Sequence, residues 1–322
     1  MTADLLGIVV VNYGSSRLLE ENLAALVTAD RPFRIVVVDN FSSAGERAAT
    51  ARLAAAHGWD LVGLPDNRGF AAGANAGIRA ARAAGCTCFL LLNPDASVTA
   101  DVAAELRGHV LRDRRALVSP QVLASDGQVF FDGSRLHLRT GRIRGRTSTA
   151  ILRGPAVEWV TGACLAVHDD LVQQMGEFDE SYFLYWEDVD FSVRALAAGA
   201  ALVVRNDLVA RHDAGGTQGP TPGRAKSALY YRYNCRNRLL FAARHLPRRR
   251  LAQWMLATPA VSWEILRRGG RRQLVEQPGL LVAAVRGSLA GLGSAAAALV
   301  RRPVRATEPG CATRHPRSSQ EP

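Results

Sequence analysis

Short apolar runs alternate with longer polar and alanine-rich segments over the first hundred residues of the chain. Each run is mostly Val, Ile and Leu and ends at turn-forming residues, which is typical of buried strands. Ser15 or Ser16 is a candidate cap for the first helix. Strands are predicted at residues 7–11, 34–39, 61–64 and 88–92, with helices that end near residues 27 and 57 and a third that follows a glycine-rich turn at 66–77. This alternation predicts βαβ units and an α/β fold with a mostly parallel central sheet flanked by helices.

Beyond about Ala116 the pattern changes to shorter strands and turns. A helix then begins at a cluster of carboxylates and runs to about Ala198. Two basic, partly amphipathic helices come later, and the final segment, rich in Pro, Arg and Ser, is predicted to be disordered. The expected boundaries are 118–122 and 128–131 for short strands, 157–167 for an apolar stretch, 201–205 for a strand, 209–217 for a loop with His212, 227–243 and 251–267 for the basic helices, and 303–322 for the tail.

Polar residues follow the predicted strands where a parallel sheet binds its ligands, beyond the carboxyl ends. Asp39 ends the second strand, and Asp95 follows the fourth in the sequence Asn93-Pro94-Asp95. The glycine-rich turn at 66–77 follows the third strand and opens a helix, so its backbone N–H groups could meet a phosphate. Each feature also has a structural interpretation. An aspartate can cap a turn, and a glycine-rich turn can have a purely structural role without binding a ligand.

The densest group of candidate residues lies at 183–191, where Glu187, Asp188 and Asp190 stand among aromatic residues. Like charges this close repel, and burial penalises them further. A fold tolerates such a cluster more readily where the carboxylates accept a proton or face a cation. A carboxylate in these surroundings can have a raised pKa, which suits a general base, and Asp188 is the candidate. The alternative is an exposed helix N-terminus, where acids favour the helix dipole.

Composition describes a folded protein with an uneven charge. The chain has 322 residues, 48% hydrophobic and 21% charged, which allows one large domain with an extension or two domains. The net charge of +11 is concentrated at residues 224–305, which hold 17 basic and two acidic residues. Residues 1–223 carry a net −4. A basic extension on a near-neutral body indicates an anionic surface or acceptor, unless it is only a solvated arginine-rich face.

The remaining compositional signals are weaker. The five cysteines lack paired metal spacing and predict no disulfide framework, which fits a reducing cytoplasm. Cys86 and Cys88 start an apolar run and are expected to be structural. The N-terminus is not expected to be a signal peptide. Residues 280–300 form the longest apolar stretch, but Arg286 interrupts it, so it is a weak candidate for a membrane span.

Taken in order, these segments resemble inverting family 2 glycosyltransferases with the GT-A fold. The resemblance covers about residues 5–245 and is closest to a bacterial rhamnosyltransferase-like branch. His212, 24 positions beyond Asp188, stands where related enzymes place a metal-binding histidine. The other matching motifs are Val9-Val-Val-Asn-Tyr13, Val38-Asp39-Asn40, Asp66-Asn-Arg-Gly-Phe70 with Asn75, Asn93-Pro-Asp95 in place of the family's DxD, and Trp186-Glu-Asp-Val-Asp190.

The resemblance implies roles for particular residues. Asp188 would be the base, with Glu187 and Asp190 beside it as catalytic residues. Asp95 and His212 would bind Mg²⁺ or Mn²⁺, although Asn93 in place of the first DxD aspartate removes one negative charge from the site. The nucleotide-sugar donor would contact Asn12, Asp39, Asn67, Arg68, Gly69, Asn75 and Asn93.

The resemblance also implies a setting. The favoured donor is dTDP-L-rhamnose, and the favoured acceptor is a lipid-linked saccharide of cell-wall or polysaccharide biosynthesis. The basic extension would then hold a cytoplasmic protein peripherally at the inner face of the cell membrane, with no nucleic-acid partner. The expected domains are 1–223 for catalysis, 224–302 for the extension and 303–322 for the tail. Three alternatives stay open: transfer to a soluble natural product, a non-catalytic nucleotide- or nucleic-acid-binding protein, and membrane anchoring without catalysis.

Overall fold

The computed structural model of the chain describes residues 4–23, 26, 33–146, 148, 154–212 and 226–301. The strands are β1 (Leu5–Asn12), β2 (Phe33–Asp39), β3 (Asp60–Gly63), β4 (Cys86–Leu92), β5 (Ala96–Ser97), β6 (Ala116–Leu123), β7 (Val129–Phe131), β8 (Ser134–His137), β9 (Arg142–Gly145), β10 (Ala156–Trp159), β11 (Cys164–His168) and β12 (Ala201–His212). The helices are α1 (Ser16–Leu23), α2 (Ala44–His57), α3 (Gly69–Ala83), α4 (Ala100–Arg112), α5 (Asp169–Met175), α6 (Glu187–Ala197), α7 (Ala228–His245), α8 (Arg248–Leu256), α9 (Thr258–Arg267), α10 (Arg271–Glu276) and α11 (Gly279–Arg301).

The central sheet has nine strands in the order β3-β2-β1-β4-β11-β6-β12-β5, with β7 paired to β6. Strands β3, β2, β1 and β4 are parallel to one another, as the alternating pattern predicts. Strand β11 runs antiparallel between β4 and β6, so the sheet is mixed beyond β4. This insertion arises because β11 comes from the irregular part of the chain, where no crossover helix imposes parallel pairing.

Helix α3 packs against the sheet at unusually close range. A side chain at Gly73 would lie 2.6 Å from Val11, and one at Gly77 would overlap Val9. The glycines therefore allow the backbone of α3 to approach β1, and this fixes the start of the helix at the carboxyl ends of β1 and β2. The core of the sheet is built from the predicted apolar runs, and Ile8, Val37 and Leu90 are fully buried.

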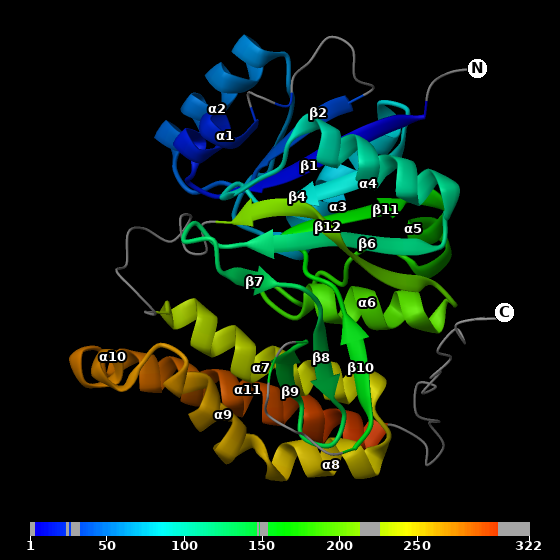
Figure 1. Cartoon of the computed structure of the whole chain (residues 1–322). Coiled ribbons are helices and arrows are strands. Elements are labelled where there is room, and N and C mark those ends of the chain that lie inside the picture. The colour runs from blue at the N-terminus through cyan, green and yellow to red at the C-terminus, as the bar shows by residue number, and fades with distance from the viewer. Residues whose placement is uncertain are drawn as a thin grey trace, which may run out of the picture.

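A second layer, formed by helices α7 to α11, lies on the other side of α6 from the main sheet, and strands β8, β9 and β10 reach into it (Figure 1). Helices α7 and α11 pack along each other at close range. Gly287 of α11 allows this approach, because a side chain there would overlap the backbone carbonyl of Arg232. By length and composition, α11 is the single helix of the described residues that could cross a membrane, although one of its faces packs within the protein.

Two local predictions differ from the structure. The basic helix expected at 251–267 is two helices, α8 and α9, because Pro259 lies in the first turn of α9 and cannot continue α8. The loop expected from residue 209 is a strand as far as His212, since β12 pairs with β6 and β5; residues 213–217 lie outside the described part. The described cysteines are free thiols, as predicted.

Candidate functional site

Two of the predicted nucleotide-binding residues lie side by side at the ends of β1 and β2. Asn12 and Asp39 are register partners, and both are buried. The Asn12 amide is used within the protein, since it donates to Thr50 Oγ1 at 3.0 Å and accepts from the backbone N–H of Ser15 at 3.1 Å. Asp39 accepts from Arg47 Nε through Oδ2 at 2.6 Å, while its Oδ1 has no hydrogen-bond partner in the described structure. Asp39 therefore has a carboxylate oxygen left for a ligand.

The turn that opens α3 is held against the end of β2. Asn40 donates to Asn67 Oδ1 and to the carbonyl of Gly69, both at 3.1 Å, and accepts from the backbone of Arg68 at 2.9 Å. Gly69 has φ = 85°, a conformation that favours glycine, and a side chain there would overlap the carbonyl of Phe183. The Arg68 side chain is exposed at the start of the helix. The structure thus brings Asp39, Asn67, Arg68 and Gly69 to one edge of the sheet.

Asn75 lies one and a half turns into α3 and is buried. Its amide donates to the carbonyl of Phe178 at 2.9 Å and to Glu180 Oε1 at 3.1 Å, and it accepts from the Phe178 backbone at 2.9 Å. These bonds use both ends of the amide. The structure therefore places Asn75 as an anchor for the segment that leads to the carboxylate cluster.

Asp95 and His212 are brought together by the pairing of β5 with β12. Ala96 and His212 are register partners, and His212 Nε2 lies 3.0 Å from Asp95 Oδ1 and 3.5 Å from Asn93 Nδ2. His212 Nδ1 is buried without a partner among the described residues. Two ligands of one octahedral cation, each about 2.1 Å from it, lie about 3 Å apart, so this spacing fits a shared divalent ion. No group of three or more His, Cys, Asp or Glu side chains in the described ranges is arranged to hold a metal ion, so other ligands would come from substrate or water.

The carboxylate cluster begins α6 after a strained turn. Tyr185 and Trp186 have φ values of 65° and 76°, which non-glycine residues seldom adopt. Asp188, the second residue of the helix, is partly buried and accepts from the backbone N–H of Gly162 at 3.2 Å and of Val189 at 2.8 Å. Removal from water raises the pKa of Asp188 to about 6, although these backbone bonds oppose the shift. Such a carboxylate can take a proton near neutral pH.

Glu187 and Asp190 differ from Asp188 in what surrounds them. Glu187 is buried, and its burial, together with the neighbouring Asp188, raises its pKa well above the usual value. Burial also acts to raise the pKa of Asp190, but bonds from His245 at 2.6 Å and Arg194 at 2.7 Å outweigh it and lower the pKa. Residues two apart on a helix point to different sides, and Asp190 points toward His245 and Arg194. The structure therefore gives the Asp190 carboxylate structural partners, and it does not bring it to the carboxylate of Asp188.

Helix α7 holds the strained turn in place, a feature that sequence patterns did not reveal. Asn237 is fully buried and donates to the carbonyls of Leu184 and Tyr185 at 2.9 and 2.8 Å. Arg236 donates to Asn237 Oδ1 at 2.6 Å and to the carbonyl of Ser181 at 3.1 Å. The only sequence signal was a pair of polar residues inside a predicted helix, and such a pair does not show which element the two side chains contact. The carboxylate cluster is thus fixed by a helix of the basic extension.

Backbone hydrogen bonds link the three groups of predicted residues to one another. The Phe70 backbone in α3 donates to the Phe183 carbonyl at 2.8 Å. This bond ties the turn at residues 66–69, which is predicted to bind the nucleotide and is called the nucleotide turn, to the segment before the carboxylates. Gly162, which binds Asp188, is followed by Ala163, whose carbonyl accepts from the Asn93 backbone at 3.0 Å. The nucleotide turn, the Asp188 carboxylate and the Asp95–His212 pair therefore converge, although they come from distant parts of the chain.

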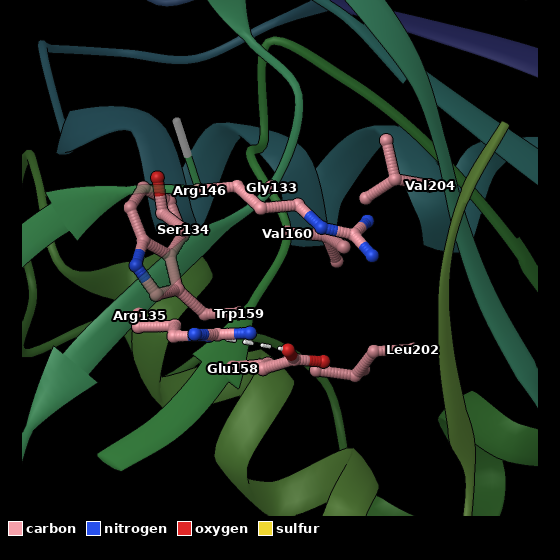
Figure 2. A pocket seen from close by; sticks show the side chains of 9 residues that line it. All are labelled: Gly133, Ser134, Arg135, Arg146, Glu158, Trp159, Val160, Leu202 and Val204. Atoms are coloured by element: carbon pink, nitrogen blue, oxygen red, sulfur yellow. Dashed lines mark ion pairs between the residues drawn. The ribbon is translucent and has the colours of Figure 1, made fainter. Parts of the chain in front are cut away.

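A separate pocket lies beside the first half of β12, whereas His212 ends that strand (Figure 2). Figure 2 shows the Arg146 side chain on one side of it and the Arg135–Glu158 ion pair on the opposite side. None of the residues predicted for the site lines this pocket. It does not belong to the site described above.

Comparison with known proteins supports the same fold and chemistry. The family described as "Glycosyl transferase family 2" matches residues 7–176. The low-salt glycan biosynthesis hexosyltransferase Agl10 of Haloferax volcanii is 28% identical over 197 residues, which cover 60% of this chain and 62% of Agl10. The N-acetylglucosaminyl-diphospho-decaprenol L-rhamnosyltransferase of Mycobacterium tuberculosis is 28% identical over 223 residues, which cover 61% of this chain and 72% of that enzyme. The chain therefore spans less than two thirds of the Haloferax relative.

Solved structures show the same fold at low sequence identity. The mannosyltransferase PcManGT of Pyrobaculum calidifontis, in complex with GDP-Man and Mn²⁺, has a TM-score of 0.52 and 18% identity; the match covers 92% of this chain and 87% of that one. GalNAc-T7 with UDP, GalNAc and Mn²⁺ also has a TM-score of 0.52, with 16% identity over 74% of this chain and 50% of that one. The predicted GT-A fold, with a helical C-terminal extension, is confirmed.

Proposed function

Because the chain belongs to glycosyl transferase family 2, we propose that it transfers a sugar from a nucleotide-sugar donor to an acceptor hydroxyl with inversion at the anomeric carbon. The observation that carries this proposal is Asp188, a carboxylate with a raised pKa next to the nucleotide turn. In one displacement, Asp188 accepts the proton of the acceptor hydroxyl. The freed oxygen attacks the anomeric carbon, and the bond to the nucleoside diphosphate breaks. Glu187, the buried neighbour, has its own pKa raised by burial and by the Asp188 carboxylate.

The nucleotide would lie along the edge formed by β1, β2 and the start of α3. The unpartnered Oδ1 of Asp39 and the exposed Arg68 are the groups available to contact it, and the Gly69 backbone allows close approach. Asn12, Asn67, Asn75 and Asp190 are used within the protein, and we assign them to holding these elements in position.

Asp95 and His212, with Asn93 beside them, are the residues that would hold Mg²⁺ or Mn²⁺. Their 3.0 Å spacing and the mixed oxygen and nitrogen donors support this assignment. Such an ion neutralises the charge that develops on the departing diphosphate. The low number of protein ligands fits a metal that also binds substrate oxygens.

The extension supports a membrane-borne acceptor. One face of α11 packs within the protein through Ala284 and Gly287, whereas the opposite face exposes Val285 and Leu289 by 56% and 62%. An apolar stripe beside many arginines is typical of a helix that lies in an anionic membrane interface. We therefore favour a lipid-linked saccharide acceptor and a cytoplasmic protein bound peripherally to the membrane. The name of the mycobacterial relative, which includes a diphospho-decaprenol acceptor and L-rhamnose, supports this acceptor and this sugar. We keep dTDP-L-rhamnose as the favoured donor.

In this proposal the boundary between the catalytic domain and the extension, which was expected between residues 223 and 224, moves along the chain. Asn237 of α7 binds the turn before Asp188, and His245 binds Asp190, so α7 completes the catalytic unit. The membrane-facing part then begins after α7, at α8. The segment at 303–322 lies outside the described residues.

A nucleotide-release assay tests the proposed reaction. The purified protein is incubated with a panel of nucleotide-sugars and Mn²⁺ or Mg²⁺, with and without EDTA, alongside the Asp188→Asn variant. We expect release from one donor, lost with EDTA and in the variant, while calorimetric donor binding by the variant is retained. Full turnover by Asp188→Asn would refute the base assignment. Binding of nucleotide or nucleic acid without any turnover, including with saccharide acceptors, would favour the non-catalytic alternative.

A flotation assay with vesicles tests the membrane surface. Wild-type protein is mixed with vesicles of phosphatidylglycerol and phosphatidylcholine, or of phosphatidylcholine alone, alongside a Val285→Asp/Leu289→Asp variant. A Leu61→Asp/Val129→Asp variant adds the same charge at exposed sites of the main sheet and serves as the control. We expect the α11 variant alone to lose binding to anionic vesicles. Equal binding by all three proteins would contradict the proposed surface and would favour a soluble acceptor.

A further inference from the structure

Two positively charged side chains meet on one tyrosine beside the catalytic segment. Lys226 Nζ lies 5.6 Å from the centre of the Tyr230 ring, and Arg268 Nη1 donates to the Tyr230 hydroxyl at 3.3 Å. Lys226 precedes α7, whereas Arg268 follows α9, so the two cations are brought together by the fold and not by the sequence. Neither forms an ion pair with a carboxylate in the part of the chain that the structure describes.

The cation pair is connected to the catalytic site through aromatic contacts. The Tyr230 ring packs edge-on against Tyr185, with centroids 5.3 Å apart, and Tyr185 is three residues before Asp188. One turn further along α7, Tyr233 stacks on Phe183 at 5.1 Å, next to the nucleotide turn. These four aromatic side chains, which we call the aromatic ledge, are all half-buried and lead from the base toward the cations: Phe183, Tyr185, Tyr230 and Tyr233.

The position of Lys226 is fixed from the extension. Gln273 of α10 is buried and binds the Lys226 backbone in both directions, accepting from its N–H at 3.0 Å and donating to its carbonyl at 2.7 Å. The same Gln273 oxygen accepts from the Tyr231 hydroxyl at 3.2 Å. The backbone that carries Lys226 is therefore held at this place, although its ammonium group has no acidic partner.

Placing two cations together without a counter-ion costs electrostatic energy, and a single cation–π contact stabilises only modestly. An anion with several oxygens would remove this cost, because lysine and arginine both donate strongly to phosphate. We propose that Lys226, Arg268 and the Tyr230 hydroxyl bind the diphosphate of the acceptor, while the acceptor sugar lies along the aromatic ledge toward Asp188. This inference rests on the proposed function, and it assigns the residues that would hold the diphosphate of the proposed acceptor.

Transfer to two acceptors tests the site. One acceptor is N-acetylglucosamine linked through diphosphate to a short polyprenyl chain, and the other is the same sugar as a neutral octyl glycoside; both are presented in neutral detergent. The Lys226→Gln/Arg268→Gln variant is compared with wild type and with Arg267→Gln/Arg271→Gln, which removes the same charge from exposed neighbours. We expect the first variant to raise the KM of the diphosphate acceptor roughly 10- to 100-fold. The octyl glycoside, the donor KM and acceptor-free donor hydrolysis should be unchanged.

The outcomes separate this inference from its premise. Absence of donor turnover in the wild-type protein would mean that the proposed function has failed. An unchanged KM for the diphosphate acceptor in the Lys226→Gln/Arg268→Gln variant, or an equal loss with the octyl glycoside, would overturn the diphosphate site. A loss of binding to phosphatidylglycerol vesicles without a change in acceptor KM would assign the cations to lipid headgroups, and would also overturn it.

Discussion

The Asn237→Ala substitution should both destabilise the protein and slow its reaction, because the Asn237 side chain joins α7 to the turn before the carboxylates by two hydrogen bonds. Its buried amide donates to the carbonyls of Leu184 and Tyr185 at 2.9 and 2.8 Å. Tyr185 and Trp186 are in left-handed conformations, which cost of the order of 1–3 kcal/mol each and persist only where neighbours hold them. Alanine provides no donor for the two carbonyls.

The magnitude follows from these bonds. Leaving a buried carbonyl without its donor costs about 1–3 kcal/mol, and both carbonyls lie in half-buried residues, so we expect a loss of about 2–4 kcal/mol in the free energy of unfolding. This is a large share of the ordinary stability of a protein. Relaxation of the turn would also displace Asp188, and a shift of about 1 Å at a reacting group can slow a reaction about 100-fold.

Asn234→Ala is the matched control. Asn234 is the same residue type on the same helix and is also buried, but its amide donates at 3.0 Å to the Tyr230 carbonyl of its own helix. We expect it to cost about 1 kcal/mol or less and to leave the rate nearly unchanged. Urea unfolding followed by circular dichroism measures stability, and single-turnover transfer at saturating donor measures the chemical step.

A second variant keeps the test decisive if Asn237→Ala does not fold. Asn237→Asp retains the size of the side chain and the acceptor for Arg236, but it turns a carboxylate toward the two carbonyls. It should slow the single turnover while the donor still binds. The reasoning would be refuted if either folded variant matched Asn234→Ala in both its urea midpoint and its single-turnover rate.

Three further outcomes follow from individual contacts. Since burial raises the pKa of Asp188 to about 6, the base is protonated at lower pH, and kcat should increase from about pH 5 to about pH 7 in a pH–rate profile; a flat profile would contradict its role. Gly69→Ala should sharply reduce donor affinity measured by calorimetry, because its φ is 85° and a side chain would overlap the Phe183 carbonyl; unchanged affinity would show that the turn relaxes freely. Gly287→Leu should lower the thermal midpoint by several degrees by separating α11 from the Arg232 backbone, whereas Gly293→Leu, where a side chain meets open space, should not.

The sequence alone determined the parallel half of the sheet and the positions of the polar groups at its edge. Apolar runs of strand length can be buried only as central strands, and the residues that end them, such as Asp39 and Asp95, must then lie at the carboxyl edge. The acids at 187–190 could also be recognised from sequence, because so many charges near aromatic residues are difficult to place without a function. These features are local or follow from the period of the side chains.

Other features of the site were decided only by the tertiary structure, because they depend on pairings between distant segments. Asp95 and His212 meet because β5 pairs with β12, a contact across 117 residues that no local pattern encodes. Tertiary structure also decides the partner of Asp190. Its carboxylate binds His245 of α7, whereas Asp188 remains in the site. Burial and hydrogen bonding from other elements determine which carboxylate of a cluster can exchange a proton, so identical residue types two positions apart acquire different chemistry.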